Sequence, residues 1–544
     1  TRALRAESAA PPRVALAPHL AQRLLAERAA RIARPSLPMR TVRDAGVPSG
    51  SDGSGGAGEA SVLRSTLDAR VQEAASRLLE EQLRELRGRN VRDGAVLVVD
   101  NASGDVLAYV GGRGARASAR HVDAVRARRQ AGSTLKPFLY ATALDERLLT
   151  AASLLQDTPL ALPVAGGMYQ PRNYDEGFRG LVSMRSALAS SLNVPAVRTL
   201  ELVSADAFVA RLRALGLGLE RGAAFYGPAL ALGSAEVSLE ELVGAYRALA
   251  NRGIVSPLHR TPAAASTLAD DEATGPLRSP SGAPALDGPA TRVFSPEAAF
   301  VVADVLSDRD GRSATFGLEN ALATPGWSAV KTGTSKEMRD NWCIGFSRRF
   351  TIGVWVGNAS GEPMHDVSGL TGAAPVWREL MGLLEADGSS VPPEPPAGVV
   401  RAATSFAHGA EAARDEWFLR GTEPGPTGAA LAPPRPRIAS PQPGTIVAID
   451  PDIPRDLQRL ALEAHGVGHG GAVARWRLDD ADLGAASGLR LWALVAGRHR
   501  LALVACDGRV LDEVAFEVRG GPAPVAAAAS HGASSSPPVP DADA

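Results

Sequence analysis

Strand-forming segments occur in two groups, at opposite ends of one long region of the chain. They occupy 95–100, 106–111, 328–333, 342–346 and 351–356. The first two flank residues 101–104 and predict a hairpin. Residues 181–256, which separate the groups, have a mostly helical pattern. Both groups fit most simply into one antiparallel five-stranded sheet flanked by helices, which places the region in the α+β class.

Apolar residues at helical spacing predict the helices that flank this sheet. A first helix follows Ser65 and Thr66, which are suited to cap it, and carries apolar residues from Leu67 to Leu83. Further helices are predicted at 133–145, 184–192, 195–203, 207–215, 238–252, 295–307 and 374–384. The last of these is expected to cover the sheet.

A hydroxyl and an amine stand three residues apart in the stretch 130–138, where one helix is predicted to begin. Pro137 lacks a backbone N–H and fits only a first helical turn, so this helix is expected to start near Ser133. Positions i and i+3 share a helical face, so Ser133 Oγ and the amine of Lys136 can approach each other. Free N–H groups at a helix N-terminus also suit a developing oxyanion. The stretch predicts a serine nucleophile with a lysine base.

Lysine is rare in this chain, although basic residues are common. The chain has 58 Lys and Arg residues, and only Lys136, Lys331 and Lys336 are lysine. Arginine effectively keeps its proton, whereas a buried lysine can lose it near another cation. The use of lysine at positions 136 and 331 therefore favours a chemical need for amines there.

Two further motifs complete a recognisable set. A Ser-x-Asn triplet runs from Ser191 to Asn193 between two predicted helices, and Lys-Thr-Gly-Thr occupies 331–334 on a predicted strand. Singly, the triplet is more often a helix cap and Lys-Thr-Gly more often a strand end. In the order Ser-x-x-Lys, Ser-x-Asn, Lys-Thr-Gly they match the motifs of penicillin-binding proteins and serine β-lactamases.

Acyl transfer from a peptide needs a nucleophile, a proton acceptor, an oxyanion site and a grip on the substrate. Ser133 is the predicted nucleophile. Lys136 is its predicted base, kept neutral by burial and by repulsion from Lys331. Ser191 is expected to relay the proton to the leaving amine, and Asn193 to orient Lys136 and a substrate amide.

The strand motif supplies the predicted grip on the substrate. Lys331 and the hydroxyls of Thr332 and Thr334 are expected to hold a substrate carboxylate. Gly333 would let the substrate lie against the strand edge. The backbone N–H groups of Ser133 and Thr334 are the predicted oxyanion pair. The predicted chemistry requires no metal and no cofactor.

Residues 60–390 resemble the transpeptidase domain of class A penicillin-binding proteins, and within them the penicillin-binding protein 1C family. The supporting stretches are 169–175 (YQPRNYD), 331–335 (KTGTS), 339–342 (RDNW) and 353–357 (GVWVG). Residues 437–520 are similar to the small C-terminal domain that distinguishes that family. The resemblance implies a β-lactamase/transpeptidase-like fold. It also implies a D,D-transpeptidase that cross-links peptidoglycan stem peptides, is acylated by β-lactams and has some D-Ala-D-Ala carboxypeptidase activity.

The family also carries a membrane anchor and a glycosyltransferase domain with a Glu-Asp motif, both upstream. Residues 1–60 are too short for these and contain nothing like them, so the chain is interpreted as the part downstream. Glycan polymerisation is therefore assigned to no residue here. The implied location is the periplasmic face of the inner membrane, with the anchor outside this chain. Asn173 and Asp340 are expected to have structural roles, as polar groups that cap loops.

Composition divides the chain into five parts. The predicted parts are an N-terminal linker segment with a helix at 18–34 (1–60), the transpeptidase domain (61–392), a Pro/Gly-rich linker (393–435), a small β-sandwich domain (436–520) and a disordered tail (521–544). The sandwich is predicted from short strands at regular spacing, at 445–449, 457–462, 473–478, 489–494, 500–505 and 514–518. It is expected either to bind cell wall or partner proteins of cell-wall synthesis, or to act as an inert spacer.

The net charge and the cysteine content bear on possible partners and on disulfide bonds. The formal net charge of −1 gives no indication of a nucleic-acid partner. Cys343 and Cys506 fall in different predicted domains and are expected to be free thiols.

Two alternatives remain open at this stage. A serine β-lactamase or D,D-carboxypeptidase uses the same three motifs with water as acceptor, although the extra β domain and Leu192, in place of an aspartate, disfavour a class A β-lactamase. A non-catalytic penicillin-recognising sensor would also be acylated, but it would not join peptides.

Overall fold

The computed structural model of the 544-residue chain divides into two compact units, Thr1–Glu423 and Pro424–Ala544, and each is described by itself. In the first unit the structure describes residues 16–32, 62–112, 117–164, 167–262, 289–317, 320–388 and 390–423. In the second it describes 424 and 436–520 except 442–443, 451–453, 455–457, 466, 468–473, 487 and 489. Apart from residues 16–32, the predicted N-terminal segment 1–60 lies outside these residues, as does the predicted tail 521–544.

The first unit is organised around one antiparallel five-stranded sheet in the order β11–β12–β13–β1–β2. Its strands are β1 (Asp93–Asp100), β2 (Val106–Val110), β11 (Ala329–Thr334), β12 (Asp340–Phe346) and β13 (Phe350–Gly357). Pairing of β1 with β13 joins the two groups of strands that lie far apart in the sequence. The predicted five-stranded sheet is confirmed, and β11 lies at its edge.

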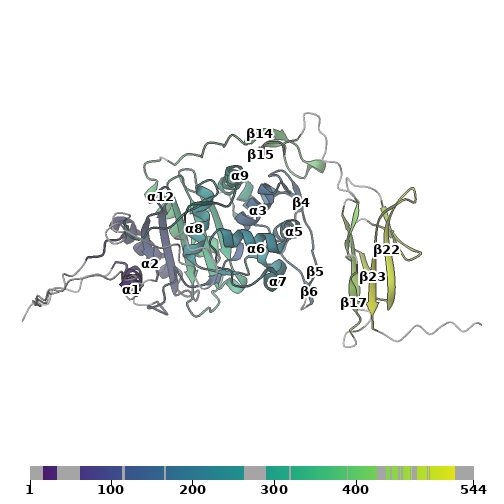
Figure 1. Cartoon of the computed structure of the whole chain (residues 1–544), viewed down its shortest axis with the longest axis horizontal. Coiled ribbons are helices and arrows are strands. Elements are labelled where there is room, and N and C mark those ends of the chain that lie inside the picture. Colours follow the sequence, from purple (N-terminus) through teal and green to yellow (C-terminus); the bar gives the residue numbers. More distant parts are fainter. Residues whose placement is uncertain are drawn as a thin grey trace, which may run out of the picture. The chain divides into compact units, whose positions relative to one another are not determined.

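Both faces of the sheet are buried because successive side chains of a strand point to opposite sides. On β1, Ala95, Leu97 and Val99 pack in one apolar cluster with residues of α3 (Lys136–Asp145) and α8 (Leu239–Ala250). Val96 and Val98 pack in the other, with residues of α2 (Ala69–Glu85) and α12 (Ala374–Leu384). Figure 1 shows α2 and α12 on one side of the sheet and α8 on the other. The predicted cover by the last helix is confirmed.

The remaining elements of the first unit surround this sheet. The helices are α4 (Met184–Ala189), α5 (Asn193–Val203), α6 (Ala205–Ala214), α7 (Ala223–Tyr226), α9 (Pro296–Ser307), α10 (Arg309–Phe316) and α11 (Gly369–Gly372). Four short strand pairs were not predicted, namely β3 (Arg129–Gln130) with β8 (Glu236–Val237), β4 (Leu154–Asp157) with β7 (Gly180–Ser183), β5 (Leu162–Val164) with β6 (Gly167–Tyr169), and β9 (Ile254–Val255) with β10 (Thr291–Arg292). Segments of two to four residues carry too little periodicity to be recognised in a sequence.

The first cap was assigned to the wrong residues. Asp68, not Ser65 or Thr66, caps α2, and its side chain accepts hydrogen bonds from the backbone N–H groups of Arg70 and Val71. The hydroxyl of Thr66 instead donates to the carbonyl of Val106. Adjacent cap-forming residues look alike in a sequence, and contact with β2 decides between them.

The helix predicted near the N-terminus is confirmed as α1 (Pro18–Ile32), but it is not part of a free linker. Leu20 is buried in the main apolar cluster of the first unit. Arg23 donates to both carboxylate oxygens of Glu240 on α8 at 2.9 Å. An apolar contact and a largely buried ion pair therefore hold α1 on the domain.

The segment 393–435 is not a linker throughout, contrary to the prediction. Strands β14 (Val399–Thr404) and β15 (Arg414–Leu419) form an antiparallel hairpin that belongs to the first unit. Pro and Gly suggested an irregular chain, but the alternation of buried and exposed residues in Arg414–Leu419 marks a half-buried strand.

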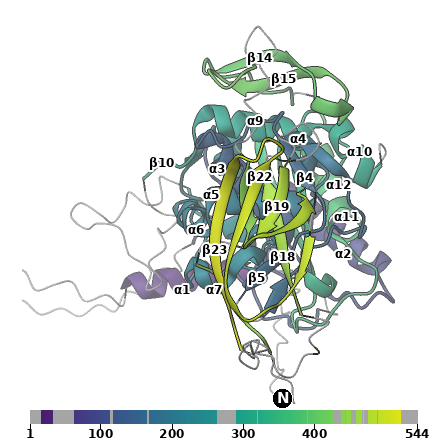
Figure 2. The ribbon, with the colours of Figure 1, turned by 90° about the vertical axis from the view of Figure 1, so that its right-hand side faces the viewer.

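The second unit consists of two small sheets around one apolar core. Its strands are β16 (Arg437–Ser440), β17 (Ile446–Ala448), β18 (Arg459–His465), β19 (Ala474–Leu478), β20 (Ala481–Ala485), β21 (Arg490–Ala493), β22 (Gly497–Ala505) and β23 (Val510–Arg519). The sheet orders are β17–β23–β22–β19–β20, which Figure 2 shows in large part, and β16–β18–β21. The buried side chains of Trp476, Leu501 and Phe516 fill the space between them. The predicted sandwich is confirmed, with β16 and β20 as strands that were missed.

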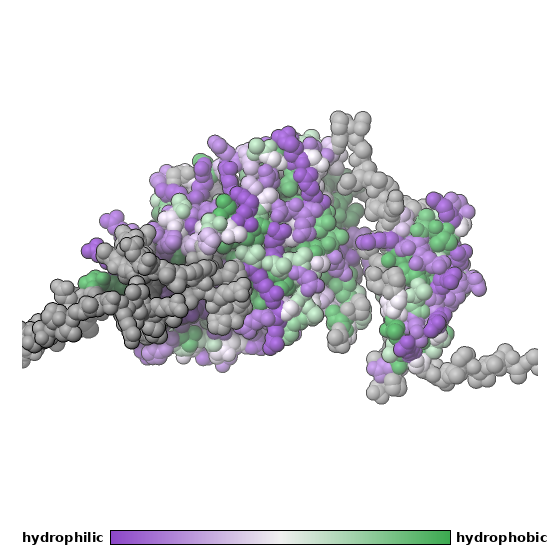
Figure 3. Space-filling model, viewed as in Figure 1, coloured by the Kyte–Doolittle hydropathy of each residue, from purple (hydrophilic) through white to green (hydrophobic). Residues whose placement is uncertain are grey.

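Hydrophilic residues cover much of the visible surface of both units (Figure 3). Among the described residues, no helix combines the length and the apolar character that a membrane span requires.

Candidate active site

Ser133 lies where the backbone changes from a short 3₁₀ turn, Gly132–Leu135, to α3. The predicted start of the helix is confirmed, with Pro137 in its first turn. A 3₁₀ turn places residues i and i+3 on one side, so Ser133 and Lys136 share a side of this turn. Ser133 is partly exposed, whereas Lys136 is fully buried. The hydroxyl is therefore accessible from outside and the amine is not.

Gly132 allows the nucleophile turn to approach the edge strand closely. Its φ is +55°, a value that residues with a Cβ rarely adopt. A Cβ at this position would also lie 2.8 Å from the carbonyl oxygen of Thr334. The backbone of Gly132 thus lies directly against β11.

Lys136 is held by the Ser-x-Asn turn. Its Nζ donates to the carbonyl of Ser191 at 2.7 Å and to Oδ1 of Asn193 at 2.6 Å. Burial lowers the pKa of Lys136 well below its usual value, and the nearby Lys331 lowers it further. A neutral amine has two N–H donors and one lone pair. With both donors engaged, the lone pair is left to accept a proton.

Ser191 lies between the two lysines. Lys331 Nζ donates to Ser191 Oγ at 2.8 Å, and Lys136 Nζ lies 3.5 Å from the same oxygen. Ser191 has φ of +59°, a conformation that costs a non-glycine residue about 1 to 3 kcal/mol. This turn ends α4 at Ala189, three residues earlier than predicted. This strained conformation places the hydroxyl of Ser191 between the two amines.

Lys331 is nearly fully buried on β11, and its Nζ also donates to the carbonyl of Thr332 at 3.0 Å. Burial lowers its pKa to about 7. Of its neighbours, the buried thiol of Cys343 opposes this shift, and the Arg312 guanidinium adds to it. A bound anion would favour the charged form of this amine.

The other residues of the strand motif form the wall beside the nucleophile. Gly333 has no room for a side chain, because a Cβ there would lie 2.7 Å from Cγ2 of Thr134 and 2.8 Å from the carbonyl of Ala131. Thr334 Oγ1 accepts a hydrogen bond from the backbone N–H of Gly369 at 3.0 Å. The structure therefore brings together residues from all three motifs, namely Ser133, Lys136, Ser191, Asn193, Lys331, Thr332, Gly333 and Thr334.

No hydrogen bond joins Ser133 Oγ to Lys136 Nζ in the part of the chain that the structure describes. The amine is directed to the Ser-x-Asn turn instead. Sequence spacing showed that the two groups share a side of the helix, but it did not show which other acceptors compete for the amine.

A buried carboxylate behind Asn193 was missed. The backbone N–H of Asn193 donates to Oδ1 of Asn173, whose Nδ2 donates to both oxygens of Asp157 at 2.8 and 2.9 Å. Asn193 Nδ2 also donates to the carbonyl of Arg172. Asn173 thus has the structural role that was predicted for it. In the sequence, Asn173 could be singled out only by its place in the stretch 169–175, which does not include Asp157.

Asp340 also has a structural position. Its backbone N–H donates to Ser335 Oγ at 2.9 Å, and its carboxylate accepts from Trp355 Nε1 at 3.1 Å. These bonds fix the turn between β11 and β12. Among the described residues, no group of three His, Cys, Asp or Glu side chains is arranged to hold a metal ion.

Comparison with known families agrees with this arrangement. The model of the penicillin-binding protein transpeptidase domain matches residues 94–382, which include all eight site residues. That match covers more than half of the 544 residues, and the chain belongs to this family of penicillin-binding proteins. A second model, the Penicillin-Binding Protein C-terminus Family, matches residues 425–516.

Individual relatives can also be named. Penicillin-binding protein 1C of Escherichia coli (strain K12) is 34% identical over 378 residues, which are 66% of this chain and 44% of that protein. Penicillin-binding protein 1B of Vibrio cholerae serotype O1 (strain ATCC 39315 / El Tor Inaba N16961) is 30% identical over 324 residues, 58% of this chain and 39% of that protein. The chain thus spans less than half the length of these relatives.

Among solved structures, Penicillin-Binding Protein 1A from Haemophilus influenzae matches with a TM-score of 0.50 and 23% sequence identity. The match covers 61% of this chain and 54% of that one. It supports the assignment of the fold.

Proposed function

We propose that this chain is a serine D,D-transpeptidase that cross-links peptidoglycan stem peptides and is acylated by β-lactams at Ser133. The observation that carries the proposal is the pair of buried amines around one hydroxyl. Lys136 and Lys331 both contact Ser191, and the pKa of each is lowered. Burying two amines together is costly, and clustered groups with perturbed pKa values indicate a functional site.

In the proposed acylation, Ser133 Oγ attacks the carbonyl carbon of the donor peptide while its proton moves to the lone pair of Lys136. The carbonyl oxygen becomes an oxyanion, which the backbone N–H groups of Ser133 and Thr334 stabilise. The C–N bond then breaks, and the leaving amine takes the proton from Lys136 through the hydroxyl of Ser191. The product is an ester on Ser133.

Deacylation reverses these roles. An amine of the acceptor peptide attacks the ester carbonyl, its proton passes to Lys136, and Ser133 Oγ leaves with that proton. Lys331, with the hydroxyls of Thr332 and Thr334, holds the carboxylate of the donor or of the β-lactam. The place of Lys331 on the edge strand supports this part, and its pKa of about 7 lets a bound carboxylate favour the charged amine.

The main rival is hydrolysis of the ester, as in a β-lactamase or a D,D-carboxypeptidase. Efficient hydrolysis in class A β-lactamases uses a glutamate to activate water. Among the described residues, no Asp or Glu side chain hydrogen-bonds to Lys136, Ser191 or Lys331. This supports a long-lived acyl-enzyme, with carboxypeptidase turnover as a side reaction only.

Labelled penicillin tests the proposal. A stable adduct located on Ser133 by mass spectrometry supports it, whereas rapid release of hydrolysed penicillin identifies a β-lactamase. An assay with donor and acceptor stem peptides then separates a transpeptidase from a penicillin-recognising sensor, because a sensor forms an adduct but no cross-linked product.

The second unit and the cellular setting belong to the same proposal. Residues 436–520 would contact cell wall or synthesis partners, and their removal should then change localisation or cross-linking. If neither changes, the domain is a spacer. The working molecule would act at the periplasmic face of the inner membrane, with an anchor and a glycosyltransferase domain upstream.

A further inference from the structure

The hairpin β14–β15 lies in a part of the chain that neither family model covers. One model ends at residue 382 and the other begins at 425. The hairpin nevertheless belongs to the first unit, and its strands pair along their whole length, from Val399 with Leu419 to Thr404 with Arg414. Its contacts show what it does there.

The strongest contact is an ion pair between the hairpin and α4. Glu416 on β15 is completely buried and accepts hydrogen bonds from Nε and Nη2 of Arg185, the second residue of α4, at 2.7 and 2.5 Å. Arg185 is itself buried. Two parallel hydrogen bonds between a guanidinium and a carboxylate fix direction as well as distance.

A second contact holds Ser183, the residue immediately before α4. Ser183 caps this helix, and its backbone N–H donates to Oε1 of Glu411 at 2.6 Å. Arg414 donates to Ser183 Oγ at 2.9 Å and to Glu411. The hairpin therefore holds α4 at its N-terminal end through both backbone and side chain.

The opposite end of α4 carries the catalytic turn. Ser191 donates its backbone N–H to the carbonyl of Leu188, and Leu192 donates to that of Ala187. The carbonyl of Ser191 in turn accepts from Lys136. Since α4 is only six residues long, a shift at its N-terminus is carried to Ser191 with little loss.

The same arginine connects the hairpin with the elements behind Lys331. Arg185 also donates to Asp304 on α9 and to Asp308, whose side chain caps α10. Arg312, one of the groups that lower the pKa of Lys331, lies on α10. Arg185 thus joins three elements that position the two sides of the amine cluster.

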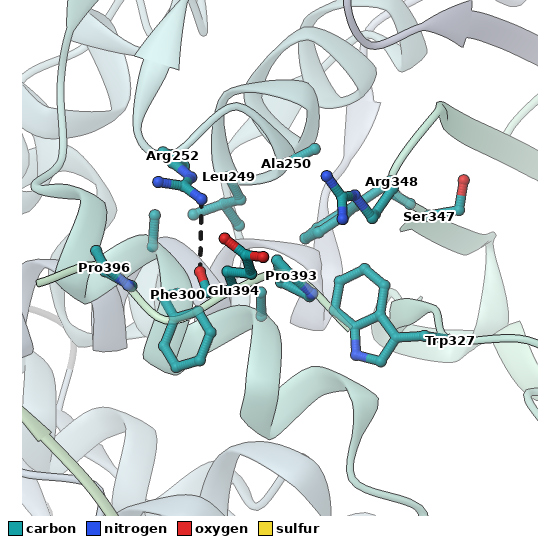
Figure 4. Close-up of a pocket in the computed structure, with 13 residues that line it drawn as sticks. Leu249, Ala250, Arg252, Phe300, Trp327, Ser347, Arg348, Pro393, Glu394 and Pro396 are labelled. Atoms are coloured by element: carbon teal, nitrogen blue, oxygen red, sulfur yellow. Dashed lines mark hydrogen bonds between the residues drawn. The ribbon is translucent and has the colours of Figure 1, made fainter. Parts of the chain in front are cut away.

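The rest of the hairpin is attached by apolar contacts, and Val399 and Leu419 are buried in the main apolar cluster of the first unit. Trp417 packs edge-to-face on Phe300 of α9, with ring centroids 5.4 Å apart. The segment that leads to the hairpin leaves a cavity of about 170 Å³ against α9, and Pro393, Pro396 and Phe300 are among the residues that line it (Figure 4). The segment before the hairpin is thus loosely packed, whereas the ion pair of Glu416 is a buried and directional contact between the hairpin and α4.

We propose that the β14–β15 hairpin is part of the active-site scaffold, and that Glu416 is a positioning residue. Through Arg185 it holds α4 so that Ser191 and Asn193 stay in register with Lys136 and Lys331. For its catalytic consequence the inference rests on the proposed acyl transfer, whereas its structural part stands independently.

The test compares Glu416→Gln with Asp415→Asn. Glu416→Gln removes the negative charge that holds Arg185 toward β15, whereas the ion pairs of Arg185 with Asp304 and Asp308 remain, so the guanidinium should shift toward these two carboxylates. Asp415 is the adjacent residue on β15, but it is exposed and forms an ion pair with exposed Arg401 at 3.8 Å. The two substitutions make the same chemical change one residue apart.

Two measurements on the full chain follow. We expect Glu416→Gln to lower the rate constant of acylation by labelled penicillin about 10- to 100-fold, the effect of displacing a catalytic group by roughly 1 Å. The penicillin dissociation constant should stay within about twofold, because β11 is not displaced. Hydrogen exchange of the 184–193 amides should rise in Glu416→Gln and remain unchanged in Asp415→Asn.

A control separates positioning from general loss of stability. Leu380 is fully buried in α12, in the cluster on the other face of the sheet, so Leu380→Ala destabilises the fold away from α4. Its folded fraction should be acylated at the unaltered rate. An equal loss of acylation in Leu380→Ala, or unchanged exchange over 184–193 in Glu416→Gln, overturns the inference. If the unaltered chain takes up no penicillin, the proposed function fails, and the exchange data alone decide on the hairpin.

Discussion

The two units of this protein differ in where their ionisable groups lie. In the first, Lys136 and Lys331 are buried together, and burial lowers the pKa of both. In the second, the core around Trp476 is apolar, and ion pairs such as Arg475 with Asp482 lie on the surface. Both units bury ample apolar surface, so stability alone does not explain the buried amines.

The difference shows that the first unit tolerates destabilising groups at its candidate active site. A buried amine loses its hydration and destabilises the fold unless it is neutral or well paired. An exposed pair costs little and contributes little, typically about 0 to 1 kcal/mol. The first unit tolerates two buried amines and a Ser191 backbone of positive φ, as expected of a preorganised site. The described part of the second unit contains no comparable cluster.

The largest expected effect in the first unit comes from the nucleophile. Ser133→Ala should abolish the penicillin adduct, because no hydroxyl remains to form the ester. Its melting temperature should be unchanged, since Ser133 is only partly buried and Lys136 bonds elsewhere. Mass spectrometry after penicillin treatment checks this. An adduct on the variant would show that another residue is the nucleophile.

Next is the base. Lys136→Arg replaces an amine that can be neutral by a guanidinium that keeps its proton, so acylation should fall by roughly 10² to 10⁴, the usual contribution of a general base. Lys336→Arg is the matched control, because Lys336 is exposed and outside the cluster. Stopped-flow acylation measures both variants. Equal rates would remove Lys136 from the mechanism.

A substitution in the core of the second unit sharpens the comparison from the other side. Trp476→Ala should destabilise that unit by about 3 to 5 kcal/mol, because it empties the centre of a small core. Calorimetry should show an earlier unfolding transition for the second unit. The acylation rate should stay the same. A parallel loss of acylation would mean that the first unit depends on the second.

The pH dependence follows from Lys331. Its amine is charged below a pKa of about 7 and neutral above it, so a carboxylate is held less well as pH rises. The second-order rate constant of acylation should therefore fall above about pH 7, at most tenfold per pH unit. A β-lactam whose carboxylate is blocked as an ester should not show this fall. The same fall with the ester would assign it to another group.

The smallest effect is expected on the surface of the second unit. Asp482→Asn removes the exposed pair with Arg475 and should change the free energy of unfolding by less than about 1 kcal/mol. Chemical denaturation measures the change. A larger loss would show that this pair is not the simple surface contact that its exposure indicates.

Much of the fold was predictable because it depends on local patterns. The five strands of the main sheet and the helices α3, α5, α8, α9 and α12 followed from hydrophobic periodicity within a residue or a few of their bounds. The hairpin β14–β15 was missed for the opposite reason. It lies between two stretches rich in Pro and Gly, 392–398 and 421–435, and its position depends on the ion pair of Glu416 with Arg185, 231 residues away.

The sequence by itself determined the three motifs, their order and the scarcity of lysine, and hence the chemistry expected at Ser133. Only the tertiary structure decided that Lys136 bonds to the Ser191–Asn193 turn, that Asp157 lies behind Asn173, and that Glu416 holds α4. The physical reason is distance along the chain. Periodicity and capping act over a few residues, whereas burial and ion pairing join groups that no local pattern connects.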